Sequence, residues 1–165
     1  MTVKERTPIS PEAAPNLEVA RQRLSTDGCS ALEDATIAQD LAVMERKEWP
    51  WHTIDGVNIF KKHVLEDQII MQLGQHFLGK RVMVHCLRQH MYPGRVFLWT
   101  KGGPEVGLRS HLIHLYPEGA IVRYICGSHL HDVPAEEGVR SVNEVDEQEY
   151  EKAGCTSFTK KTGGK

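Results

Sequence analysis

The stretch from Leu108 to His131, LRSHLIHLYPEGAIVRYICGSHLH, decides how this chain is expected to fold. Two runs in which apolar residues alternate flank Pro117-Glu118-Gly119, which is a combination typical of two strands joined by a tight turn. We therefore predict a β-hairpin in which residues 108–116 pair with residues 120–126. A Gly-Ser-His loop follows directly, and four of the nine histidines lie in this stretch. The hairpin is expected to carry imidazoles to the rim of a β-structure.

Most helical patterns precede the hairpin, whereas most strand patterns lie next to it. Apolar residues at three- and four-residue spacing and capping residues predict the helices, and strict alternation predicts the strands. The predicted helices cover residues 16–24, 34–48, 63–78 and 141–152, and the predicted strands cover residues 82–86, 95–100, 108–116, 120–126 and 156–159. A turn is predicted at Asp55-Gly56. This order predicts an α+β fold with an antiparallel sheet or a small barrel.

The composition is that of an ordinary globular domain. Among 165 residues, 40% are apolar and 25% are charged, and the formal net charge is −2. This balance gives no electrostatic basis for binding nucleic acid or an acidic membrane. The sequence shows no secretory signal and no apolar run near the roughly 20 residues of a membrane span. We expect a cytoplasmic protein with a mobile tail at 1–15, one domain at 16–159 and a flexible tail at 160–165.

The four cysteines lie far apart and form no Cys-x-x-Cys pair, so we expect them to be reduced thiols. They are Cys29, Cys86, Cys126 and Cys155.

The histidines of the hairpin are the candidate ligand-binding residues. His111 and His114 are three residues apart, so on a regular strand they point to opposite faces and cannot hold one metal ion together. His129 and His131 are two apart and would project together from an extended segment. With Glu136 they form His-x-His-x4-Glu, which resembles the first metal motif of cupins. A solvated loop is the alternative interpretation.

The chain also resembles the phytanoyl-CoA dioxygenase-like proteins. Residues 20–28, ARQRLSTDG, look like the opening helix of that family with its Asp-Gly step, and a second helix follows. Cys126-Gly127-Ser128-His129 is similar to the Gly-Ser-His that closes a core strand there. The resemblance covers roughly residues 20–132. It implies N-terminal helices packed on an antiparallel double-stranded β-helix, a jelly-roll or cupin-like barrel, with Fe(II) and 2-oxoglutarate as cofactors.

The iron ligands that this resemblance implies are not evident in the sequence. The family holds iron with His-x-Asp/Glu and a distal histidine, yet no His-x-Asp or His-x-Glu occurs and no histidine follows His131. Two accounts remain open: a small protein that kept the scaffold and lost the metal, or an incomplete barrel whose closing strands are absent or come from a partner. The second account predicts homo- or hetero-oligomers, because an open barrel exposes strand edges.

Three functions follow as expectations. The first is a dioxygenase-like protein that binds a small organic molecule, of the kind met in secondary-metabolite biosynthesis. Its pocket would use His111, His114, Arg123, His129 and His131, with Arg123 or Tyr124 as the anion or oxyanion contact. If it is active without iron, the reaction would be a redox-neutral isomerisation, cyclisation or dehydration. The second is a non-catalytic partner of an active homologue, and the third is a cupin-like metalloprotein or isomerase using His129, His131 and Glu136.

Overall fold

The computed structural model describes Lys4 and residues 16–31, 34–50, 52–79, 96–138 and 142–160. The described chain is helical up to residue 78 and contains strands from residue 96 onward. The predicted α+β class is thereby confirmed at the level of a mixed helix and sheet protein. The predicted strand at 82–86 lies outside the described residues, as do both predicted tails except for Lys4 and Lys160.

Side-chain caps mark the start of α1 (Leu17–Asp27), α2 (Ala35–Arg46) and α4 (Gln68–Leu78). Asn16 accepts a hydrogen bond from the Glu18 N–H and Asp34 accepts one from the Thr36 N–H, so two predicted helices begin where their caps indicated. The first helix extends three residues further than predicted and ends at Gly28, whose φ of 74° is left-handed. The other helical elements of this half are α3 (Ile54–Phe60) and the π-helix η1 (Lys61–Leu65).

The single helix predicted over residues 63–78 is wrong in its first five residues. Asp67 caps α4 by accepting from the Ile70 N–H, so the chain breaks there, and η1 precedes the break. The turn predicted at Asp55-Gly56 is also wrong, because both residues lie inside α3. Gly56 is buried in this helix, and packing has overridden its weak helix propensity.

Two antiparallel sheets form the other half. The larger has the strand order β1-β4-β3, with β1 (Val96–Leu98) and β3 (Glu136–Glu137) on either side of β4 (Asn143–Val145). The smaller pairs β2 (Val122–Cys126) with β5 (Thr156–Lys160), and Tyr124 lies opposite Phe158. The helix predicted to open at Ser141 is instead α5 (Glu147–Lys152), capped by Asp146, because its expected first turn forms β4.

The predicted hairpin is wrong in its pairing. The turn exists, since the Ala120 N–H donates to the Pro117 carbonyl at 3.3 Å and Gly119 has a φ of 79°. Residues 108–115 form no strand, however, and β2 pairs with β5, which is about thirty residues further along the chain. Alternation marks a segment as able to form a strand but does not choose its partner.

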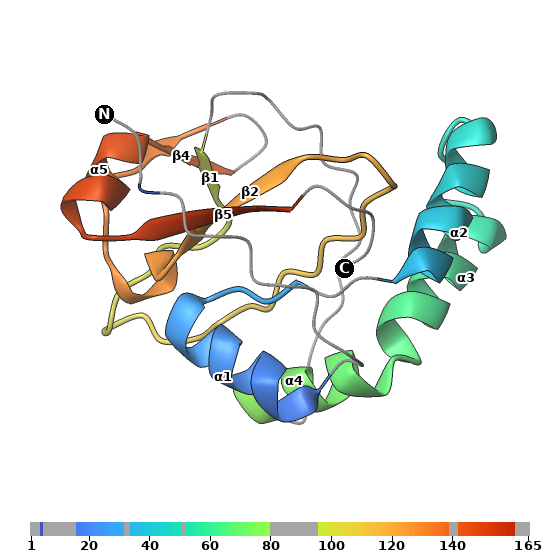
Figure 1. Cartoon of the computed structure of the whole chain (residues 1–165), viewed down its shortest axis with the longest axis horizontal. Helices are drawn as coiled ribbons and strands as arrows, with labels where there is room; N and C mark the ends of the chain where they lie inside the picture. The colour runs from blue at the N-terminus through green and yellow to red at the C-terminus, as the bar shows by residue number, and fades with distance from the viewer. Residues whose placement is uncertain are drawn as a thin grey trace.

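The small sheet lies at the centre of the molecule (Figure 1). In that view α1 and α4 lie below β2 and β5, α2 and α3 form the right-hand side, and α5 with β1 and β4 forms the left-hand side. The core on the α5 side contains Val133, Val145, Tyr150 and Cys155, and Tyr150 is 1% exposed. At the N-terminal end, the Lys4 carbonyl accepts a hydrogen bond from the Ser157 N–H of β5 at 3.0 Å.

Candidate functional site

The two faces of β2 have different neighbours. Side chains alternate along a strand, so Tyr124 and Cys126 share one face with Val122, whereas Arg123 and Ile125 share the other. Ile125 packs against the core beside α5. The face that carries Tyr124 is therefore the one that meets the imidazole of His114 and the thiol of Cys29.

His114 and Tyr124 form a hydrogen-bonded pair on this face. The His114 Nδ1 atom lies 3.1 Å from the Tyr124 hydroxyl, and both side chains are partly buried. The Tyr124 ring stacks on Phe158 of β5 with the ring centroids 5.3 Å apart. The cross-strand register of Tyr124 with Phe158 brings about this stacking, because directly opposite residues have neighbouring side chains.

Burial keeps both members of the pair uncharged. It lowers the pKa of His114, because a charged imidazolium loses its hydration there. Burial, with smaller effects of Tyr116 and Cys29, raises the pKa of Tyr124 well above its usual range. At neutral pH the pair is therefore a neutral imidazole and a neutral phenol.

This protonation state leaves one hydrogen-bond donor unused. A phenol hydroxyl is a good donor and the unprotonated ring nitrogen a good acceptor, so we assign the Tyr124 O–H as the donor to His114 Nδ1. The ring proton of His114 then sits on Nε2. That atom is buried and has no hydrogen-bond partner among the described residues. A buried N–H without an acceptor is costly, and a ligand oxygen would relieve that cost.

The end of α1 lies against the end of β2. The Gly127 N–H donates to the Asp27 carbonyl at 2.7 Å, and the Cys29 thiol donates to the same carbonyl at 3.5 Å. The Cys29 and Cys126 Sγ atoms are 3.9 Å apart. The end of α1, with Asp27 and Cys29, is thus in contact with the end of β2, with Cys126 and Gly127, although the two segments are about a hundred positions apart in sequence.

His129 also contacts the end of α1 at this junction between α1 and β2. Its Nε2 atom lies 3.2 Å from the Ser25 carbonyl, and its ring lies over Gly28. The expectation that His129 and His131 project together from an extended segment is wrong, because Ser128–Leu130 forms the single 3₁₀ turn η2. Among the described residues, no three His, Cys, Asp or Glu side chains are grouped so that they could hold a metal ion.

Two other predicted pocket residues do not join His114 at Tyr124. Arg123 lies on the opposite face of β2, where its guanidinium is 2.6 Å from the Glu147 carboxylate of α5. His111 is half-buried in the irregular segment before His114, and burial lowers its pKa. Arg123 and Tyr124 were the two predicted oxyanion contacts. Of these, Tyr124 forms the hydrogen bond with a predicted pocket histidine, which is His114.

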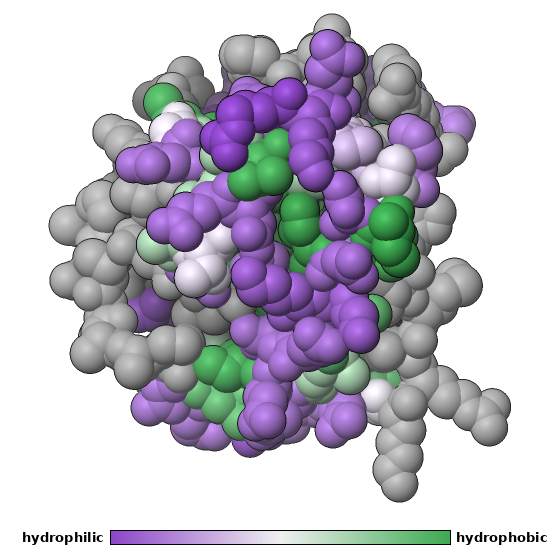
Figure 2. Space-filling view, turned by 90° about the vertical axis from the view of Figure 1, so that its right-hand side faces the viewer, coloured by the Kyte–Doolittle hydropathy of each residue, from purple (hydrophilic) through white to green (hydrophobic). Residues whose placement is uncertain are grey.

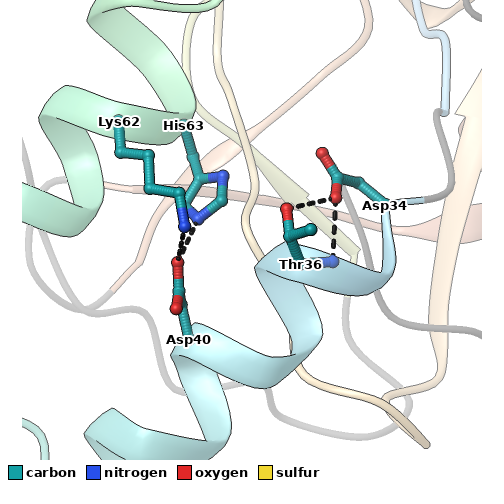
Figure 3. Close-up of polar contacts among 5 residues, drawn as sticks. All are labelled: Asp34, Thr36, Asp40, Lys62 and His63. Carbon is teal, nitrogen blue, oxygen red and sulfur yellow. Dashed lines mark hydrogen bonds and ion pairs between the residues drawn. The ribbon is translucent and has the colours of Figure 1, made fainter.

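A second polar cluster, which the sequence did not indicate, lies between α2 and η1. The Asp40 carboxylate accepts from His63 Nε2 at 2.6 Å and from Lys62 Nζ at 2.7 Å (Figure 3). His63 is only 4% exposed, so this contact joins two helices inside the protein. The hydrogen bond from Lys62 holds the pKa of Asp40 below its usual value, and the hydrogen bond from His63 adds to this, whereas partial burial acts in the opposite direction. The π-helical turn that aims His63 at α2 has no sequence signal that we recognise.

An acidic groove lies between the larger sheet and α5. It is lined by Val96, Pro134, Ala135, Glu136, Glu144, Val145, Asp146, Glu147 and Glu149. Two of its carboxylates bind cations of the chain itself, because Glu147 pairs with Arg123 and Glu149 with Lys152. The groove is therefore a partly neutralised surface and not an obvious ligand site.

Comparison with known proteins adds no relative. The chain matches no protein-family model, no curated protein and no solved structure. In the part of the chain that the structure describes, no helix has the length and apolar character that crossing a membrane requires.

Proposed function

We propose that this protein binds a small organic molecule through His114 and Tyr124, on a scaffold of the phytanoyl-CoA dioxygenase type. The observation that carries the proposal is the buried Nε2–H of His114, which has no acceptor among the described residues. A buried polar group without a partner calls for an explanation, and a ligand that supplies the missing bond is the one we propose here. The ligand would present a carbonyl or carboxylate oxygen to this donor.

The junction between α1 and β2 supports the proposed scaffold. The Asp27-Gly28 step ends α1, and Gly127-Ser128-His129 directly follows β2, as the resemblance implies. These two motifs are joined by the hydrogen bond from Gly127 to Asp27. In this proposal the two antiparallel sheets are parts of a double-stranded β-helix.

The described residues do not fit the iron centre of such enzymes. His114 has Tyr124 as its hydrogen-bond partner, His129 is directed at a backbone carbonyl, and no group of three metal-ligating side chains is present among the described residues. We therefore derive no step through iron or 2-oxoglutarate.

The chemistry available to His114 and Tyr124 is that of a neutral, oriented donor. A neutral imidazole N–H that points at a carbonyl oxygen polarises it without transferring a full charge, and it stabilises the negative charge that develops on that oxygen. Such a group suits an enolisation, cyclisation or dehydration. The proposed activity is therefore redox-neutral.

Binding of a panel of small oxo acids and aromatic carbonyl compounds, with 2-oxoglutarate among them, tests the proposal by calorimetry. We expect a compound that binds to the wild type to lose at least tenfold in affinity in both His114→Ala and Tyr124→Phe. Arg123→Ala is the matched control, because Arg123 lies on the other face of the same strand. Equal affinities in all four proteins, or no binding by any compound of the panel, would contradict the proposal.

A second candidate function, a non-catalytic partner subunit, is favoured by one surface. Figure 2 views the molecule from the side of α2 and α3, where hydrophobic side chains lie among hydrophilic ones. Ile54 is 72% exposed and Val57 52% exposed on α3. If this surface docks a partner or a second copy, light scattering after size exclusion should show an oligomer that Ile54→Asp disrupts. A monomer at all concentrations that also retains no partner would argue against this function.

A further inference from the structure

We propose that Cys29 and Cys126 form a redox-active pair that closes into a reversible disulfide when the protein meets a hydroperoxide. The Sγ atoms of these two residues are 3.9 Å apart, although the residues are separated by 97 positions in sequence. A disulfide needs the sulfur atoms about 2.05 Å apart, so they must approach by roughly 1.9 Å. Rotation about the Cα–Cβ bonds moves sulfur without moving the backbone.

The backbone around the pair holds the two segments together. Asp27, two residues before Cys29, accepts the N–H of Gly127, which follows Cys126. Cys126 is the last residue of β2 and is fixed by its pairing with β5. Cys29 lies beyond the end of α1 in a segment that belongs to no helix or strand, so its side chain can adjust. One fixed thiol and one adaptable thiol suit a disulfide that opens and closes.

The difference in exposure assigns the order of events. Cys29 is half-buried and Cys126 is buried, so a hydroperoxide reaches Cys29 first. The Cys29 thiolate attacks the peroxide, an S–O bond forms, the O–O bond breaks, and hydroxide leaves. The Cys126 sulfur then attacks the sulfenic acid, so that an S–S bond forms and the S–O bond breaks. Each step releases one hydroxide, and the two hydroxides take up the two thiol protons, one from Cys29 and one from Cys126. In total, two thiols are oxidised and one hydrogen peroxide is reduced to two water molecules.

Cys155 is nearby but is poorly placed to compete. It directly precedes Thr156, the residue that pairs with Cys126, and it packs in the core on the α5 side with Val133 and Tyr150. Cys155 is buried, and its burial raises the pKa of its thiol, which lowers the fraction of reactive thiolate. It therefore provides a matched control within the same strand pair.

The consequence of the disulfide is a covalent tie between α1 and the strand that carries Tyr124. Tyr124 lies two residues before Cys126 on the same face of β2. Oxidation would hold the two segments of the junction together even when the hydrogen bond from Gly127 to Asp27 opens. The inference stands on the thiol geometry alone and does not depend on whether His114 and Tyr124 bind a ligand.

Peptide mapping tests this directly, because trypsin is expected to place each of the four cysteines in a separate peptide. Full-length protein is treated with hydrogen peroxide, blocked with an alkylating reagent and mapped without reduction. We expect a cross-link between residues 24–46 and residues 124–140, an intact mass lower by two hydrogen atoms, a higher thermal midpoint, and full reversal by dithiothreitol. Cys155→Ser should retain the cross-link, whereas Cys29→Ser should lose it.

Three results would overturn the inference. The first is a cross-link between residues 124–140 and residues 153–160, which would make Cys155 the partner. The second is sulfinic acid at Cys29 with no cross-link, and the third is no modification at peroxide concentrations that oxidise a control dithiol. Circular dichroism of Cys29→Ser shows whether that variant is folded, and the Cys155→Ser result remains decisive if it is not.

Discussion

The imidazole of His129 lies directly on the backbone of Gly28. A Cβ atom at position 28 would be 2.2 Å from His129 Nδ1, and Gly28 also has a left-handed φ of 74°. Two independent features therefore require glycine at the end of α1. The same ring places its Nε2 3.2 Å from the Ser25 carbonyl, so it caps α1 from outside the helix. This contact joins the Asp-Gly and Gly-Ser-His motifs on which the family resemblance depends.

Gly28→Ala is expected to destabilise the protein more than its backbone conformation alone explains. The left-handed conformation costs a non-glycine residue about 1–2 kcal/mol, and displacement of the His129 ring adds about 1–3 kcal/mol of overpacking. Gly154→Ala is the control, because Gly154 has a similar φ of 78° and no atom within 4 Å of its Cβ position. Urea denaturation measures both changes.

A double-mutant cycle isolates the contact between the ring and the glycine. In a His129→Ala background, Gly28→Ala should lower the free energy of unfolding about as much as Gly154→Ala does, by roughly 1–2 kcal/mol. Only the cost of the left-handed backbone conformation then remains. If Gly28→Ala costs the same in both backgrounds, the ring does not lie where we describe it.

Gly102→Ala should destabilise the turn that carries His129. A Cβ atom at position 102 would lie 2.7 Å from the backbone oxygen of His131 and 2.9 Å from that of Ser128, and backbone atoms cannot rotate away. We expect a loss of about 1–3 kcal/mol in the free energy of unfolding. Gly74→Ala in α4 should act oppositely and stabilise by about 0.5–1 kcal/mol, since nothing lies within 4 Å of its Cβ position. Thermal denaturation of the two variants should shift in opposite directions.

Asp40→Asn should destabilise the contact between α2 and η1. The substitution weakens the hydrogen bonds from Lys62 and from the buried His63. Hydrogen bonds to a charged group of this kind together contribute about 1–3 kcal/mol to the free energy of unfolding. Asp55→Asn removes an exposed pair with Lys47 and should cost about 0–1 kcal/mol. Equal effects of the two substitutions would show that the burial of His63 contributes nothing.

The contribution of Asp40 to the stability of the folded protein should depend on pH. Its pKa is lowered in the folded state, chiefly by Lys62, so the folded protein binds fewer protons than the unfolded chain near and below pH 3.8. Its stabilising contribution is complete above that value and is lost as the pH falls through the lower folded pKa. The stability difference between the wild type and Asp40→Asn should therefore shrink on acidification. A difference that stays constant from neutral pH to pH 3 would contradict this linkage.

His111 and His114 should make the protein sensitive to mild acid. Burial lowers the pKa of both below 6.5, so protons bind more readily to the unfolded chain. Their contribution is present above the unfolded pKa and is lost as the pH falls through their folded pKa values. We expect the stability of the wild type to decline below pH 6.5, and to decline less steeply in the His111→Gln/His114→Gln double variant. An equal decline in the wild type and in the double variant would contradict this prediction.

Part of the candidate site could be read from the sequence. His114 was a predicted pocket residue, and alternation along β2 already separates Arg123 from Tyr124, so only one of those two contacts could share a face with a given partner. The pairing of His114 with Tyr124 could not be read, because residues 108–115 carry the alternation of a strand yet form none. The position of His63 opposite Asp40 depends on a π-helical turn, and hydrophobic periodicity reports only the ordinary helical period.

By itself, the sequence determined the features that act over a few residues. Asn16 and Asp34 begin helices, Gly28 and Gly154 terminate them, and the turn at Pro117 forms, because caps and turns are made by hydrogen bonds within one or two turns of chain. Only the tertiary structure decided that β2 pairs with β5 and that His129 lies on Gly28. Any alternating strand offers the same hydrogen-bonding edge to several partners, and the choice among them is made by packing between distant segments.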